Sequence, residues 1–147
     1  MKRSKVLIFL LLAVMMTGSL ILSSCGATIE PINVTLIIEA GDEEILNVTM
    51  PISMKDPTVL ALVSEAAAIY ELNVTYIENV DSIAVDVNDI ENYKTRTDEN
   101  GIAYFWDFLV DGVQRDATTG GKANVFELKD GMVIKYVYTT FDPKSSK

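Results

Sequence analysis

The sequence contains no histidine and only one cysteine among its 147 residues. Histidine is the side chain that most often moves protons near neutral pH, and with cysteine it supplies most zinc ligands. Without histidine, catalysis by Ser–His or Cys–His pairs is excluded, and a single cysteine cannot form a disulfide within the chain. We therefore expect a protein that is not an enzyme and that has no catalytic residue, metal site or built-in cofactor.

Basic residues are scarce, with 12 Lys and Arg against 21 Asp and Glu. Three of the basic residues lie within the first five positions, so the chain after residue 24 has a formal charge of −12. Such a charge repels phosphate backbones, and no cluster of Lys and Arg offsets it. Nucleic acid is therefore not an expected partner.

The first 24 residues have the pattern of an export signal. The basic residues 1–5 precede an apolar stretch at 6–22, as in a secretory signal peptide. Residues 22–26 (LSSCG) then resemble the bacterial lipobox. The resemblance implies cleavage before Cys25, lipid attachment to its thiol, and a place on the extracytoplasmic side of the cell membrane. Two or more acyl chains would hold such a protein in the lipid bilayer stably.

Two alternatives to the lipid anchor stay open at this point. The apolar stretch approaches the length of a membrane-spanning helix, so it could be an uncleaved anchor with an incidental cysteine. The protein could also be secreted after cleavage elsewhere. With the lipobox interpretation, residues 1–24 are the signal, 25–32 a tether, 33–141 one domain and 142–147 a polar tail.

The domain opens with two predicted strands, residues 33–39 and 45–52, which form a hairpin. Next, apolar residues at helical spacing predict a helix over residues 57–72. Asp56 is a suitable N-cap for it, and Pro57 suits its first position. The clearest of the later strands are residues 104–110 and 132–141; other predicted β-segments are residues 74–87 (broken near 79–81) and 125–128.

Residues 88–97 predict a loop, and Asp111-Gly112 predicts a tight hairpin turn. Hairpin, helix and further strands, in this order, predict an α+β domain with one helix packed on a mixed sheet. A β-grasp-like fold has this order.

Three segments resemble, in order, a family of bacterial domains similar to the C-terminal domain of transcobalamin. They are residues 58–62 (TVLAL), 106–112 (WDFLVDG) and 130–138 (DGMVIKYVY). This sequence departs from the family pattern by having Asp111 in place of Asn, Met132 in place of Asp and Tyr136 in place of Trp. The resemblance covers about residues 32–141. It implies a β-grasp-like fold and makes cobalamin a candidate ligand.

Five aromatic residues are the candidate ligand-binding side chains. Tyr104, Trp106 and Phe108 alternate along one strand, and Tyr136 and Tyr138 alternate along the closing strand. They could form a stacking platform for a planar ring, a sugar or the edge of a corrin. Equally, they could be the core face of two central strands.

The acidic loops at residues 86–89 and 98–100 carry oxygen ligands but lack the spacing of an EF-hand, which favours solvated turns over calcium sites. The leading hypothesis is a lipid-anchored, non-catalytic module that binds a ligand or a cell-envelope protein or glycan. The first alternative is a surface lipoprotein that binds cobalamin or another corrinoid. The second is a small hydrolase that uses paired carboxylates.

Overall fold

The computed structural model describes residues 29–78, 85–114 and 122–145. Cys25 and the lipobox-like segment lie outside these ranges, as does the expected break near residues 79–81. Within the three ranges, no helix is both long and apolar enough to cross a membrane.

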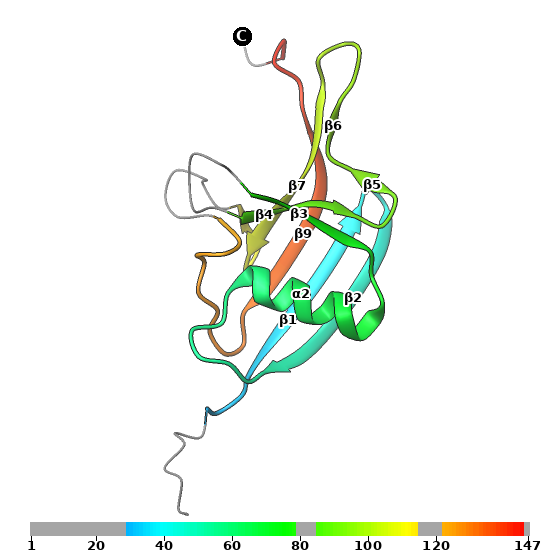
Figure 1. Cartoon of the computed structure of the whole chain (residues 1–147). Helices are drawn as coiled ribbons and strands as arrows, with labels where there is room; N and C mark the ends of the chain where they lie inside the picture. The colour runs from blue at the N-terminus through cyan, green and yellow to red at the C-terminus, as the bar shows by residue number, and fades with distance from the viewer. Residues whose placement is uncertain (1–28, 79–84, 115–121, 146–147) are drawn as a thin grey trace, which may run out of the picture.

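The main sheet has six strands, and its path runs β2-β1-β9-β7-β6, with the short strand β8 pairing separately with β7 (Figure 1). Their bounds are β1 Ile32–Ala40, β2 Glu43–Ile52, β6 Arg96–Thr97, β7 Ala103–Val110, β8 Val113–Gln114 and β9 Val133–Phe141. Strands β1 and β9 are parallel, whereas β1–β2 and β7–β9 are antiparallel. The sheet is therefore mixed, and the predicted α+β class is confirmed.

The helix α2, Val59–Tyr70, packs against one face of this sheet (Figure 1). It is shorter than the predicted range of 57–72, and Thr58 rather than Asp56 is its N-cap. The Thr58 hydroxyl accepts a hydrogen bond from the backbone N–H of Ala61 at 3.3 Å. The predicted start was therefore wrong by two residues.

The shift of the helix start has a tertiary cause. The carbonyl of Pro57 accepts a hydrogen bond from Leu128 N at 2.7 Å, and Val59 N donates to the carbonyl of Phe126 at 3.1 Å. These bonds hold the chain before the helix extended against a segment about 70 residues later. Local capping preference alone does not contain that information.

A second, antiparallel sheet contains β3 (Val74–Glu78), β4 (Val85–Ile90) and β5 (Tyr93–Lys94). The prediction of a loop over residues 88–97 was therefore wrong, because this range holds the end of β4, all of β5 and all of β6. Polar side chains support these short strands. For example, Asp89 Oδ1 accepts a hydrogen bond from Thr95 N at 3.0 Å.

The predicted strand at residues 125–128 is not a strand. Phe126 N donates to the carbonyl of Lys122 at 3.0 Å, which closes a turn. Only Glu127 forms an isolated β-bridge, with Thr58. Phe126 and Leu128 of this segment pack in or against the core, whereas Val125 is exposed, and the backbone of the segment pairs with the start of α2 and does not join a sheet.

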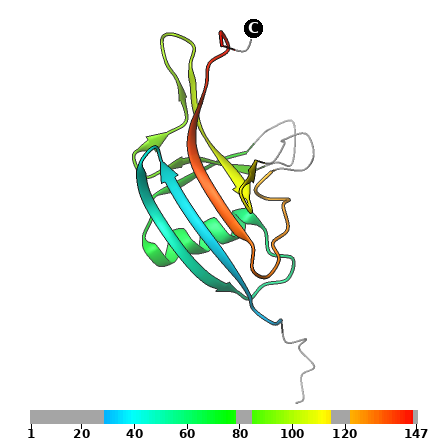
Figure 2. The ribbon, with the colours of Figure 1, turned by 180° about the vertical axis from the view of Figure 1, so that it is seen from behind.

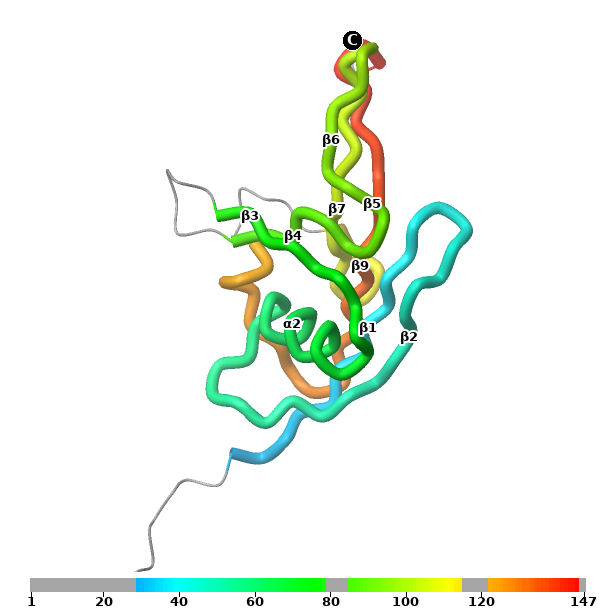
Figure 3. The backbone as a smooth tube through the Cα atoms, turned by 45° about the vertical axis from the view of Figure 1, so that its right-hand side comes forward, coloured from blue at the N-terminus to red at the C-terminus, as the bar shows by residue number. Residues whose placement is uncertain are grey.

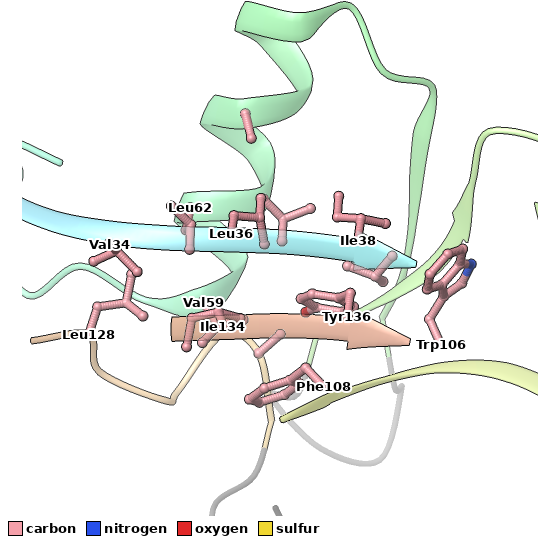
Figure 4. Close-up of a cluster of buried hydrophobic side chains, with 14 of the residues drawn as sticks. Val34, Leu36, Ile38, Val59, Leu62, Trp106, Phe108, Leu128, Ile134 and Tyr136 are labelled. Carbon is pink, nitrogen blue, oxygen red and sulfur yellow. The ribbon is translucent and has the colours of Figure 1, made fainter. Parts of the chain in front are cut away.

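The hydrophobic core lies between α2 and the main sheet, and no polar or charged residue of the described ranges is buried in it. Figure 4 shows its central members. The most deeply buried include Val34, Leu36 and Ile38 of β1, Val59, Leu62 and Val63 of α2, and Ile134 of β9. Among the described residues, no helix lies over the opposite face of the main sheet, as Figure 2 shows.

Candidate functional site

The structure divides the five predicted aromatic residues into two groups. Phe108 and Tyr136 lie in the core, with 4% and 2% of their surface exposed, and their rings pack 5.5 Å apart. Trp106 is also buried but lies at the end of the cluster that α2 does not cover (Figure 4). Tyr104 and Tyr138 are half-buried, so parts of their rings face solvent.

Tyr104 and Tyr138 lie side by side on β7 and β9. Their rings stack with centroids 6.3 Å apart and an interplanar angle of 28°. Tyr138 also contacts Trp106, at 5.2 Å between centroids. The Tyr138 hydroxyl donates to the backbone carbonyl of Lys94 at 2.5 Å, which fixes the orientation of the ring.

Two further residues complete this surface, and both come from the segment predicted as a loop. The ring of Tyr93 lies 5.4 Å from that of Tyr138, and its carbonyl accepts a hydrogen bond from Trp106 Nε1 at 2.9 Å. The guanidinium carbon of Arg96 lies 4.0 Å from the centroid of the Tyr104 ring. We call Tyr93, Trp106, Tyr138 and Tyr104 the aromatic row, with Arg96 at its outer end.

The aromatic row is anchored to the first hairpin at its inner end. The Tyr93 hydroxyl donates a short hydrogen bond to the carboxylate of Glu43. That hydrogen bond, together with burial and the nearby negative charge, raises the pKa of Tyr93 above its usual value. The hydrogen bond ties the inner end of the aromatic row to the start of β2.

The row follows the strands that leave the body of the domain. In Figures 1 and 3, β6, the start of β7 and the end of β9 project beyond the rest of the molecule as an arm. Tyr104 pairs with Thr140 on one side and with Arg96 on the other, so it lies on this arm. Trp106 pairs with Tyr138 nearer the body. The row thus runs from the core to an exposed projection.

The two acidic segments differ: residues 86–89 lie within strand β4, so the prediction of a solvated turn there was wrong, whereas residues 98–100 form a turn. Asp86 forms an ion pair with Lys122 at 2.7 Å. Asp98 Oδ1 accepts hydrogen bonds from the backbone N–H groups of Asn100 and Ile102, both at 2.9 Å. In the part of the chain that the structure describes, no three Asp, Glu or Cys side chains come together as a set that could hold a metal ion.

No protein-family model and no curated protein sequence matches the chain. Solved structures do match it. Haptocorrin in complex with Cbi superposes with a TM-score of 0.64 at 12% identity, over 78% of this chain and 26% of haptocorrin. A protein from Ruminococcus gnavus, described as metal binding, superposes with a TM-score of 0.51 at 13% identity, over 76% of this chain and 99% of that protein.

At these identities the likeness shows a common fold. It agrees with the fold that the sequence resemblance implied. The chain spans about a quarter of haptocorrin. The two neighbours carry the names of binding proteins and not of enzymes.

Proposed function

We propose that this chain is a lipid-anchored, extracytoplasmic protein whose domain binds a ring-bearing ligand, and that it is not an enzyme. The observation that carries the binding role is the half-exposed stack of Tyr104 and Tyr138. Phe108 and Tyr136 are buried in the core, whereas Tyr104 and Tyr138 are only partly buried. Tyrosine is suited to recognition because it offers rigid, amphipathic contact area at a low entropic cost.

The row is also pre-organised for binding. The hydrogen bond from Tyr138 to the Lys94 carbonyl and the stacking of Arg96 on Tyr104 fix two of the rings before a ligand arrives. Less side-chain freedom is then lost on binding, so more of the contact energy is retained as affinity. A sugar ring of an envelope glycan fits this surface, since its C–H face stacks on aromatic rings and its hydroxyls reach Arg96.

A corrinoid is the second candidate ligand. Its planar conjugated ring suits an aromatic row, and the domain shares its fold with haptocorrin, which was solved in complex with Cbi. The corrinoid proposal predicts a specific fluorescence result. Trp106 is the single tryptophan of the chain, and it contacts Tyr138.

The test is a titration of the domain, residues 26–147, followed by Trp106 fluorescence. One arm uses cobinamide and the other uses soluble peptidoglycan fragments. If a corrinoid is the ligand, micromolar cobinamide quenches Trp106 beyond the absorption measured with free tryptophan in the same solution. If a glycan is the ligand, only the fragments shift or quench the emission. No saturable change in either arm contradicts the proposed ring-bearing ligand.

A further inference from the structure

A hollow lies on the sheet face opposite α2 and the aromatic row. It has a volume of about 260 Å³ and is lined by Asp107, Leu109, Gln114, Lys135, Val137 and Thr139. Side chains alternate along a strand, so Asp107 and Leu109 point away from the face that holds Trp106 and Phe108. The two surfaces are therefore separate.

The floor of the hollow is aliphatic. Val137 lies opposite Asp107, and Leu109 lies opposite Lys135 in the β7–β9 register. Leu109 and Val137 are therefore diagonal neighbours on the same face, about 7–8 Å apart, and together they form one small apolar strip. The volume is below the roughly 300–1,000 Å³ of typical small-molecule sites. The hollow accommodates one extended side chain but not a large ring system.

The hollow is lined by one basic residue, Lys135, and one acidic residue, Asp107, and of these two only Lys135 forms an ion pair among the described residues. The Lys135 ammonium is neutralised by Glu39, at 2.7 Å. Asp107 accepts hydrogen bonds from Phe108 N at 2.8 Å and from Gln114 Nε2 at 2.6 Å, both of them neutral donors. The ion pairs of the described ranges join Lys135 to Glu39 and Lys122 to Asp86, so Asp107 belongs to neither.

Among the described residues, the carboxylate of Asp107 therefore has no cationic partner, and part of its hydrogen-bonding capacity is unused. Its two oxygens offer about four acceptor positions, and two of these are used. The bonds from Phe108 and Gln114 fix the carboxylate in place. The apolar strip beside it suits an alkyl stem. Long cationic side chains pack their alkyl stem on apolar surface and place the charged head group beside polar atoms.

From this arrangement we infer that the hollow is a second binding site, specific for an alkyl guanidinium or alkylammonium group such as the side chain of Arg or Lys on a partner polypeptide. The stem lies over Leu109 and Val137, and the head binds Asp107. The formal charge of −12 after residue 24 favours the approach of a cationic partner over long range. This inference is independent of the ring-bearing ligand.

The probe is a blocked pentapeptide, acetyl-Gly-Gly-Arg-Gly-Gly-amide, added at low salt to ¹⁵N-labelled domain, residues 26–147. We expect saturable shifts of the amides of Asp107, Leu109 and Val137. Asp107→Asn should weaken binding about tenfold, since hydrogen bonds to charged groups are the stronger class. The matched control is Asp42→Asn, which removes the same charge from an exposed turn and should leave the affinity unchanged.

Two comparisons separate the alternatives. Agmatine carries the guanidinium group of arginine on a short alkyl chain but is not part of a peptide. If agmatine binds as tightly as the peptide, the ligand is a small amine and not a polypeptide. If agmatine binds more weakly than the peptide, the result supports a polypeptide partner. A second variant, Val137→Lys, places a cation on the floor and should abolish binding even if Asp107→Asn perturbs the fold. A third probe is the same pentapeptide with citrulline, the uncharged analogue of arginine, in place of Arg. Equal binding of this citrulline peptide, or equal effects of Asp107→Asn and Asp42→Asn, overturns the inference.

Discussion

Substitution of Cys25 by alanine is expected to remove all incorporation of a clickable palmitate analogue into the protein. The loss should be complete because Cys25 is the only thiol in the sequence. Each buried CH₂ contributes about 0.8 kcal/mol to membrane binding, so the two or more acyl chains of a lipoprotein make the largest single contribution to its attachment. Label per molecule, measured on immunoprecipitated protein, is the readout.

Fractionation alone would not test this, because an uncleaved apolar stretch at residues 6–22 could keep the variant in the membrane. The matched control is Ser24→Ala, which keeps a small residue before the cysteine and should be labelled like the wild type. Incorporation that is unchanged in Cys25→Ala would disprove the lipid anchor and favour a membrane-spanning or secreted form.

Between pH 10 and 12, the free energy of unfolding of the wild-type domain is expected to fall by about 3 kcal/mol more than that of the Tyr136→Phe variant. Burial is the main cause that raises the pKa of Tyr136 far above its ordinary value of 10.0, with smaller contributions from Asp86, Tyr76 and Asp107. The folded state therefore keeps the phenol protonated where the unfolded state releases its proton. Because the pKa is higher in the folded state, Tyr136 makes its whole contribution to the free energy of unfolding below pH 10. Above pH 10 this contribution is lost at about 1.4 kcal/mol per pH unit.

The measurement is urea unfolding of both proteins from pH 8 to 12. Tyr70→Phe, at a 43% exposed position, is the control and should follow the wild-type curve. Among the described residues, the buried Tyr136 hydroxyl has no hydrogen-bond partner. Since an unpaired buried hydroxyl costs about 1–3 kcal/mol, Tyr136→Phe should also be the more stable protein at pH 8. Parallel curves for the two proteins above pH 10 would show that Tyr136 is hydrated in the folded state.

Most of the main sheet could be predicted from the sequence because its strands carry their own periodicity. The Asp111-Gly112 turn joins β7 to β8 with positive φ at both residues, 50° and 78°, as the dipeptide predicts. The segments that were predicted wrongly have no such periodicity. Strands β5 and β6 have two residues each, and they exist because β4 and β7 offer backbone partners. Tertiary pairing of this kind overrides local preference.

The candidate site was likewise only partly predictable from local sequence patterns. Alternation correctly placed Trp106 and Phe108 on one strand face, but it cannot tell how far along that face a helix extends. Helix α2 and its neighbours cover Phe108 and Tyr136, whereas Tyr104 and Tyr138 are only partly buried, with Tyr138 packed against the edge of the core. Nothing in the polar run at residues 88–97 indicated that it would supply further site residues.

The outer end of the aromatic row, at Tyr104, is proposed to bind a ligand and not to be an extension of the core. Truncation of Tyr104 distinguishes these roles. Truncating a binding residue lowers the affinity for the ligand, whereas truncating a core residue lowers the free energy of unfolding. The most direct measurement compares Tyr104→Ala with Tyr104→Phe, in ligand titration and in urea unfolding of the same samples. The ligand used is cobinamide or peptidoglycan fragments, whichever gives a saturable change of Trp106 fluorescence in the wild-type protein.

We predict that Tyr104→Ala weakens binding at least about fivefold while the free energy of unfolding falls by only about 1 kcal/mol. Tyr104→Phe, which keeps the ring, should bind nearly as the wild type does. Unchanged affinity in Tyr104→Ala, together with a loss of about 3 kcal/mol or more of stability as in a core aromatic truncation, would contradict the claim.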